Sequence, residues 1–309
     1  MHRRSFLTGS LVCVSGVFWD IALRASGGFA AGTREQKRVL FFTKNNGFYH
    51  AIVRRKKPEV LSFAEQALVK LGESANVEVV CTKDGRVFDD DLDQWDAFAF
   101  YCNNDLTQPG EPDEPPMSQA GKERLLEAIA KGKGFLGFHS TCACWRTPGP
   151  AYVNAPKVDP FLAMLGGEFI AHGPQQEATL RVVSEVFPRS KELAPGGTIR
   201  LFDEWYAMKN FARDLHVILV QETEGMKGEC YQRPPFPNTW ARHHGDGRVF
   251  FTSMAHTEAL WEHPFFHTLL LGAFDWTLRR VDVKLPPNLT EVTPEADVLR
   301  RDAKVSERT

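Results

Sequence analysis

Four short runs of almost uninterrupted apolar residues occupy the first half of the chain and constrain its fold more than any other feature. The runs cover residues 38–43, 77–81, 95–102 and 134–138. Strands that are buried on both faces of a sheet have this composition, whereas half-exposed strands alternate polar and apolar residues. Helical patterns at 58–71 and 118–131 separate the runs. This alternation predicts an α/β fold built on a doubly wound, parallel sheet.

The second half of the chain predicts further strands and one long helix. Gly245-Asp246-Gly247 is a good hairpin turn between two strand-like runs. Residues 264–280 have the periodicity of an amphipathic helix. From residue 284 onward, prolines and charges predict a surface arm or a disordered tail. We therefore expect one folded domain over 34–283 and a tail over 284–309.

Composition and short motifs exclude several functional classes. The 309 residues carry a formal net charge of −2, without a basic excess, which argues against a nucleic-acid-binding surface. No G-x-G-x-x-G follows the first predicted strand, so no nucleotide cofactor is expected. An odd number of scattered cysteines lies beyond the N-terminal segment and predicts no disulfide framework. The sequence leaves the oligomeric state open, including a homo-oligomer.

The N-terminal segment is typical of a targeting signal. Arg3 and Arg4 resemble a twin-arginine motif, a moderately apolar stretch follows at 11–23, and Ala30 offers a small residue for cleavage. We expect residues 1–33 to be an export signal for the twin-arginine translocase, which would place the protein in a bacterial periplasm. The alternative is a disordered basic start of a cytoplasmic protein.

Several histidines follow predicted strands or lie in neighbouring glycine-rich loops. The candidate metal ligands are His50, His139, His172 and His256. A lone histidine at such a place is usually structural, but the carboxyl ends of parallel strands share one edge, where distant residues meet. With Glu204, this set suits zinc or another divalent metal with an open position. Without a metal, the same groups suit general acid and base chemistry near neutral pH.

Short motifs in a fixed order resemble the trehalose-utilisation, or ThuA-like, family over residues 37–281. They are Val39 to Phe42, Gly47-Phe48-Tyr49-His50, Gly137-Phe138-His139-Ser140, Phe169 to His172, Asp203-Glu204-Trp205-Tyr206, Trp240 with Gly245-x-Gly247-Arg248-Val249-Phe250, His256, and the helix between Trp261 and Trp276. The resemblance implies a class I glutamine-amidotransferase-like fold, a flavodoxin-like three-layer α/β/α sandwich with a mostly parallel sheet. It also implies carbohydrate metabolism, with oxidised (3-keto) sugars and glycosides as suspected substrates.

The resemblance also indicates what the chain does not do. Glutamine amidotransferases present a cysteine on a strand-to-helix elbow, and a later His-x-Glu element completes their triad. Here His139 stands at the elbow, while His256-Thr257-Glu258 is similar to the His-x-Glu element. An imidazole cannot form the glutamyl thioester, so we expect no glutaminase activity.

We expect an exported, metal-assisted enzyme that hydrolyses, eliminates or isomerises a keto-sugar or glycoside. The candidate catalytic residues are His139, His256 and Glu204. The candidate substrate-binding residues are Asn45, Asn46, Asn103, Trp145, Asp203 and Tyr206. Two alternatives stay open: a non-catalytic sugar- or metal-binding module on the same fold, and a hydrolase that uses Cys142 or Cys144 as its nucleophile.

Overall fold

The computed structural model describes residues 35–110, 114–193 and 197–300. The predicted export signal at 1–33 and the end of the predicted tail lie outside these residues. The described residues from Gln36 to Arg300 belong to one compact unit. Among the described residues, no helix has the length and apolar character needed to cross a membrane.

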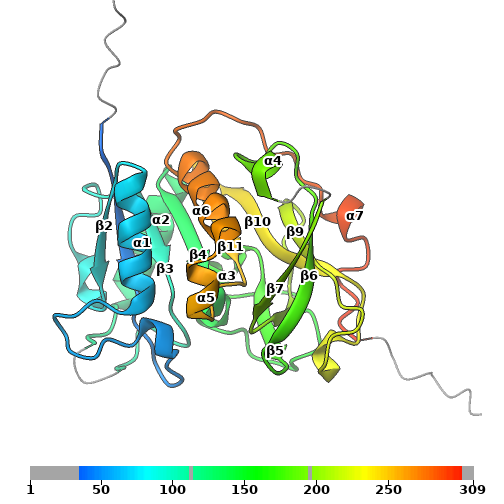
Figure 1. Ribbon diagram of the computed structural model, residues 1–309. Helices are drawn as coiled ribbons and strands as arrows, with labels where there is room; N and C mark the ends of the chain where they lie inside the picture. The colour runs from blue at the N-terminus through cyan, green and yellow to red at the C-terminus, as the bar shows by residue number, and fades with distance from the viewer. Residues whose placement is uncertain (1–34, 111–113, 194–196, 301–309) are drawn as a thin grey trace, which may run out of the picture. The chain divides into compact units, whose positions relative to one another are not determined.

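Five parallel strands form one half of a mixed sheet (Figure 1). In spatial order they are β2 (Val77–Thr82), β1 (Lys37–Phe42), β3 (Ala97–Phe100), β4 (Gly134–Phe138) and β11 (Gly247–Thr252). Each of the four apolar runs overlaps one of these strands, and neighbouring strands are paired in parallel. The predicted α/β fold is confirmed. All five carboxyl ends lie at the same edge of the sheet.

The other half of the sheet is antiparallel. It continues from β11 through β10 (Phe236–His244), β9 (His216–Gln221), β6 (Gln176–Val182) and β7 (Thr198–Asp203). The turn at 245–246 joins β10 to β11 as the hairpin pattern predicts. A separate two-stranded sheet pairs β5 (Glu168–His172) with β8 (Tyr206–Lys209). The antiparallel strands β10, β9, β6 and β7 are what make the main sheet mixed.

Helices cover both faces of the sheet (Figure 1). One layer holds α1 (Phe63–Ser74), α5 (Glu258–Trp261) and α6 (Pro264–Thr277), and the other holds α2 (Gln119–Ala130) and α3 (Pro160–Leu165). Alternate side chains of a strand point to opposite faces, and β4 contacts both layers in this way. Phe135 packs on Phe161 of α3 at 5.7 Å, and Phe138 packs on Trp261 of α5 at 5.6 Å between ring centroids.

Helix α1 begins five residues later than its apolar periodicity suggests, because Ser62 caps it. The Ser62 side chain accepts a hydrogen bond from the Glu65 backbone, and the Glu65 carboxylate accepts one from the Ser62 backbone. This reciprocal pair satisfies two donors that a helix start leaves free. The predicted cap of α2 is confirmed, since the Ser118 hydroxyl accepts from the Gly121 backbone at 2.8 Å.

Residues 285–299 pack on the domain, so the prediction of a surface arm is wrong for this stretch. Its buried apolar side chains are Leu285, Leu289, Ala296 and Leu299. Asn288 hydrogen-bonds both backbone groups of Val217 at the start of β9. The remaining short elements are α4 (Ser190–Leu193), α7 (Leu289–Val292) and the 3-10 helices η1 (Ala51–Val53), η2 (Gly85–Asp89), η3 (His139–Ala143) and η4 (Glu229–Tyr231).

Candidate metal centre

His139 begins a sharp elbow at the carboxyl end of β4. Its φ of +43° lies in the left-handed region, which costs a non-glycine residue about 1–3 kcal/mol, and η3 starts at the same residue. Nδ1 lies 2.7 Å from the carbonyl oxygen of Ser253. A carbonyl only accepts, so Nδ1 donates its proton there, and Nε2 is the nitrogen left to meet a ligand. Nε2 is buried and has no hydrogen-bond partner in the described part of the chain.

His50 lies in the loop after β1 and faces the elbow. Its ring centroid is 5.1 Å from that of His139 and 5.4 Å from that of His256. Burial, followed by repulsion from the neighbouring histidines, lowers the pKa of His50 to about 2. Nε2 lies 3.3 Å from the Tyr206 hydroxyl, while Nδ1 is buried with no hydrogen-bond partner among the described residues. The imidazole is therefore neutral, as a metal ligand must be.

His256 is held in place by Asp203, which ends strand β7. The Asp203 carboxylate accepts hydrogen bonds from three successive backbone N–H groups, those of Ala255 at 2.9 Å, His256 at 3.3 Å and Thr257 at 3.0 Å. Ala255 has a φ of +99°, so these bonds stabilise a strained turn. Burial, followed by repulsion from His139, lowers the pKa of His256 to about 4.

Glu204 lies between three of the histidines. Oε1 is 3.4 Å from His139 Nε2 and 3.7 Å from His256 Nε2, and Oε2 is 3.2 Å from His172 Nδ1. Burial opposes ionisation of this carboxyl, but its interactions with His139, and then with His256 and His172, outweigh burial and lower its pKa. The group is a carboxylate at neutral pH.

Four side chains offer ligand atoms that all lie within 4.8 Å of one another, and these are His50, His139, Glu204 and His256. Three imidazoles and one carboxylate form a donor set that suits zinc and similar divalent metals. The buried, unpartnered nitrogens of His139 and His50 fit this interpretation, because an imidazole lone pair without a partner is costly. His172 is not in this set. It is 44% exposed and contacts the set through Glu204.

Tyr206 is the predicted sugar-binding residue that the structure places against the cluster. Its ring centroid lies 4.0 Å from that of His139, and its hydroxyl contacts His50. Asp203 was expected to bind substrate as well, but its fully buried carboxylate is used by the backbone of residues 255–257. Burial raises the pKa of Asp203 to about 6. Its position makes Asp203 a support for His256.

The three predicted asparagines hold the loop that carries His50. Asn45 donates to the Thr43 carbonyl, Asn46 to the Asp105 carbonyl, and Asn103 to the Phe48 carbonyl, each at 3.0 Å. The amide N–H groups are thus directed at the backbone, where they tie this loop to the end of β3. These contacts place the asparagines in the framework of the site.

Trp145 is also occupied by protein contacts. Its indole N–H donates to Asp105 at 2.8 Å, its ring packs on Phe161, and the Lys122 ammonium lies 4.2 Å from its ring centroid. None of these partners belongs to the histidine cluster. Trp145 packs in the core next to the elbow. Its positive φ of 47° continues the sharp turn that begins at His139.

Two aromatic residues of the site escaped prediction. Tyr101 is fully buried, and its ring lies 5.6 Å from His50 and 5.8 Å from His139, centroid to centroid. It lies in an apolar run and has the sequence environment of a core residue. Phe48 is 64% exposed, and its ring centroid is 4.8 Å from that of His50. Its position directly after Gly47, in a loop rich in turn-forming residues, was the available signal.

The cysteines near the elbow are inert. Cys142 and Cys144 are fully buried, and burial raises the pKa of each thiol well above its usual range. Cys142 donates a hydrogen bond to the His139 carbonyl at 3.2 Å. A nucleophilic cysteine needs a thiolate and access to substrate, and these thiols have neither.

The fold and the site define an α/β protein whose histidine cluster lies at the carboxyl edge of a mixed sheet. The family model described as trehalose utilisation, ThuA, matches residues 38–277. The chain therefore belongs to the ThuA family.

Solved structures agree with this assignment. A ThuA-like protein from Bacteroides uniformis superposes with a TM-score of 0.58 at 19% identity, over 81% of this chain and 95% of its own. A ThuA-like protein from Parabacteroides merdae gives a TM-score of 0.57 at 20% identity, over 87% and 100% respectively. At such identities the likeness concerns the fold. No curated protein is significantly similar in sequence.

Proposed function

We propose that this protein is a metal-assisted enzyme that acts on sugars, namely 3-keto sugars or glycosides, by hydrolysis, elimination or isomerisation. The observation that supports it is the set of four convergent ligand atoms, two of whose imidazoles have buried, unpartnered nitrogens. His50, His139 and His256 would hold the metal, which leaves an open position for substrate, as in catalytic zinc sites.

Proton transfer is the proposed role of Glu204. A bound divalent metal would polarise a sugar carbonyl and acidify the adjacent C–H bond. The Glu204 carboxylate faces the ligand atoms with Oε1 and His172 with Oε2. Glu204 accepts the substrate proton, and the half-exposed His172 exchanges it with solvent. Tyr206, in contact with His50, orients the substrate with its hydroxyl.

Aromatic rings around the cluster support a carbohydrate as the substrate. Phe48 presents an exposed ring beside His50, and Phe169 packs on Tyr206 at 4.3 Å between centroids. The C–H faces of a pyranose are apolar and pack on such rings, while its hydroxyls bind polar groups between them. The family description, trehalose utilisation, agrees with this class of substrate.

Metal analysis joined to a substrate screen tests the proposal. We expect about one equivalent of a divalent metal in purified protein and turnover of an oxidised disaccharide, with trehalose and its 3-keto form in the panel. His139→Ala should lose both properties, and His243→Ala, which changes a histidine outside the cluster, should keep them. Full turnover in metal-free protein and in His139→Ala would overturn the mechanism.

A non-catalytic binding module is the second candidate. The contacts of Glu204 with three histidines engage part of the cluster within the protein itself, which is compatible with binding alone. A binder would show thermal stabilisation by sugar or metal without any turnover. Glutaminase activity is not proposed, since His139 stands at the elbow and the nearby thiols are buried.

Export is proposed from the sequence alone. The twin arginines Arg3 and Arg4 and the apolar stretch that follows them support delivery to the periplasm by the twin-arginine translocase. Cell fractionation of the full chain tests this. Arg3→Lys with Arg4→Lys should retain the protein in the cytoplasm, and an unchanged periplasmic fraction would contradict the proposal.

A further inference from the structure

A second concave region lies at the carboxyl end of β2. It encloses about 370 Å³, which falls within the range of small-molecule sites. Its lining residues are Tyr49, Arg54, Arg55, Lys56, Lys57, Pro58, Thr82, Lys83, Asp84 and Glu114. We call this region the β2 cleft. Ligands of open α/β sheets bind outside the carboxyl ends of strands, so the β2 cleft has a favourable place in the fold.

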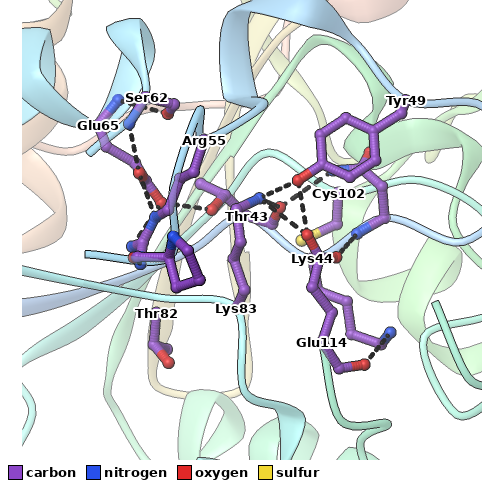
Figure 2. Close-up of polar contacts among 12 residues, drawn as sticks. Thr43, Lys44, Tyr49, Arg55, Ser62, Glu65, Thr82, Lys83, Cys102 and Glu114 are labelled. Atoms are coloured by element: carbon purple, nitrogen blue, oxygen red, sulfur yellow. Dashed lines mark hydrogen bonds and ion pairs between the residues drawn. The ribbon is translucent and has the colours of Figure 1, made fainter. Parts of the chain in front are cut away.

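The floor of the β2 cleft is a hydrogen-bonded network of buried polar and charged side chains (Figure 2). Lys83 donates to the Thr43 carbonyl at 2.7 Å and to the Tyr49 hydroxyl at 2.6 Å. Tyr49 donates in turn to Glu114 at 2.5 Å, and Lys83 lies 3.3 Å from the same carboxylate. Lys83 and Glu114 are buried and compensate each other. Lys44, also buried, joins this floor by donating to the Glu114 backbone carbonyl at 2.9 Å, so hydrogen bonds tie the floor together.

Two of the charged wall residues are compensated by neighbours outside the cleft. Arg55 forms two hydrogen bonds with the buried Glu65, which Figure 2 shows beside Ser62. Asp84 directs its carboxylate at Arg86, with both oxygens in contact with the guanidinium. Asp84 consequently does not neutralise the lysines across the cleft.

Beside Arg54, whose guanidinium lies over the Tyr49 ring at 4.4 Å, the remaining cations of the wall are Lys56 and Lys57. Both side chains are exposed, both line the β2 cleft, and neither has an ion-pair partner in the part of the chain that the structure describes. Adjacent ammonium groups that repel each other over a concave surface gain free energy when an anion binds between them.

We propose that the β2 cleft binds a small, monosaccharide-sized anion that carries a phosphate or carboxylate group, with Lys56 and Lys57 as its cationic ligands. Pro58 gives such a ligand apolar contact, while the Tyr49 ring is engaged by the Arg54 guanidinium at 4.4 Å and the Lys83 ammonium at 4.9 Å from its centroid. The chain neighbour of Tyr49 is His50, so the same loop serves the β2 cleft and the histidine cluster. The proposal does not depend on the presence of a metal.

Isothermal titration of the metal-free, chelator-treated full chain tests this inference. The probes are inorganic phosphate, gluconate as a sugar carboxylate, and glucose as a neutral control. We expect binding of at least one anion and none of glucose. K56A with K57A should weaken that binding at least tenfold, whereas K56R with K57R should restore most of it, because arginine keeps the charge.

The matched control is Lys70→Ala with Lys191→Ala, which removes the same charge from exposed lysines outside the β2 cleft. Binding of phosphate alone would identify a phosphate or phosphate-ester ligand, and binding of gluconate alone a sugar acid, and either result supports the site. Equal binding by the K56A/K57A and control variants, or no binding of either anion by the unaltered chain, would overturn it. Metal content is measured separately, so failure here is distinguishable from failure of the proposed enzyme.

Discussion

His139 donates its Nδ1 proton to the Ser253 carbonyl at 2.7 Å, and this bond joins the elbow after β4 to the end of β11. It fixes the orientation of the ring, so Nε2 faces Glu204 at 3.4 Å.

Loss of this ring should abolish metal binding. For His139→Ala we expect the zinc affinity to fall more than about 100-fold, because a directly ligating imidazole matters more than an outer partner, whose loss costs about 10–100-fold. Competition with a chromogenic chelator measures the change. His243→Ala is the matched control, and equal affinities of the two variants would refute the assignment.

Acid should destabilise the metal-free domain through His50 and His256. Their folded pKa values are lowered to about 2 and about 4, whereas a histidine in the unfolded chain titrates near 6.5. Below pH 6.5 the unfolded chain therefore binds more protons, and the free energy of unfolding falls as the pH decreases toward 4. Each neutral histidine contributes about 1.4 kcal/mol per pH unit in this window.

Urea unfolding at about pH 7.5, 6 and 5 measures this slope. His256→Gln should show a shallower dependence than the unaltered chain, since one titrating group is gone. Asp203, whose folded pKa is raised to about 6, acts in the opposite direction, but it is present in both proteins and cancels in the comparison. Identical slopes would show that His256 does not titrate on unfolding.

Asp203→Asn should destabilise the protein and weaken its metal site together. An amide supplies one neutral acceptor where the carboxylate serves three backbone donors, so we expect a loss of about 2–3 kcal/mol in unfolding free energy. Zinc affinity should fall as well, because His256 loses its support. Glu177→Gln, which breaks an exposed ion pair with Arg200, should change stability by less than about 1 kcal/mol and leave zinc affinity intact.

Phe48→Ala should weaken sugar binding without changing metal content or stability. Loss of one stacking ring raises the dissociation constant up to about tenfold. Phe202→Ala, which removes another exposed ring on β7, is the control. Titration with the tightest-binding sugar of the panel separates the two, and equal affinities would remove Phe48 from the site.

Thiol reagents should leave the native protein unaffected at the elbow. Cys102, Cys142 and Cys144 are fully buried with pKa values raised well above the usual range, so neither access nor ionisation favours reaction. Quantitative alkylation with mass spectrometry should find these three modified only after unfolding. Rapid modification of Cys142 in native protein, with release of ammonia from glutamine, would restore the hypothesis of a cysteine nucleophile.

The parallel half of the fold was predictable because continuous apolar runs have few other interpretations. The antiparallel half was harder, since its pairing depends on contacts between distant segments. Residues 285–299 were misjudged because their few apolar residues have no regular period, yet Leu285 and Leu289 are buried. The start of α1 was predicted too early because Pro58 is a favourable residue for a first helical turn. The capping box of Ser62 sets the actual start at Phe63.

Within the site, residue type and strand position were sufficient to find His50, His139, Glu204 and His256. Side-chain direction was not readable from sequence. Asp203 and Glu204 are neighbours in the chain, but one carboxylate supports a loop and the other faces the imidazoles. Tyr101 carries no local signal, because only the folded sheet brings its ring to His50.

The four ligand-bearing segments are spread from residue 50 to residue 256, and they meet only when strands from both halves of the sheet have paired. The cluster therefore has no counterpart in a partly folded chain or in a fragment that ends before residue 256. Any ligand that it holds must shift the folding equilibrium of the whole unit and not that of a single loop. A ligand bound to the cluster is therefore evidence that the segments from residue 50 to residue 256 have reached their native arrangement.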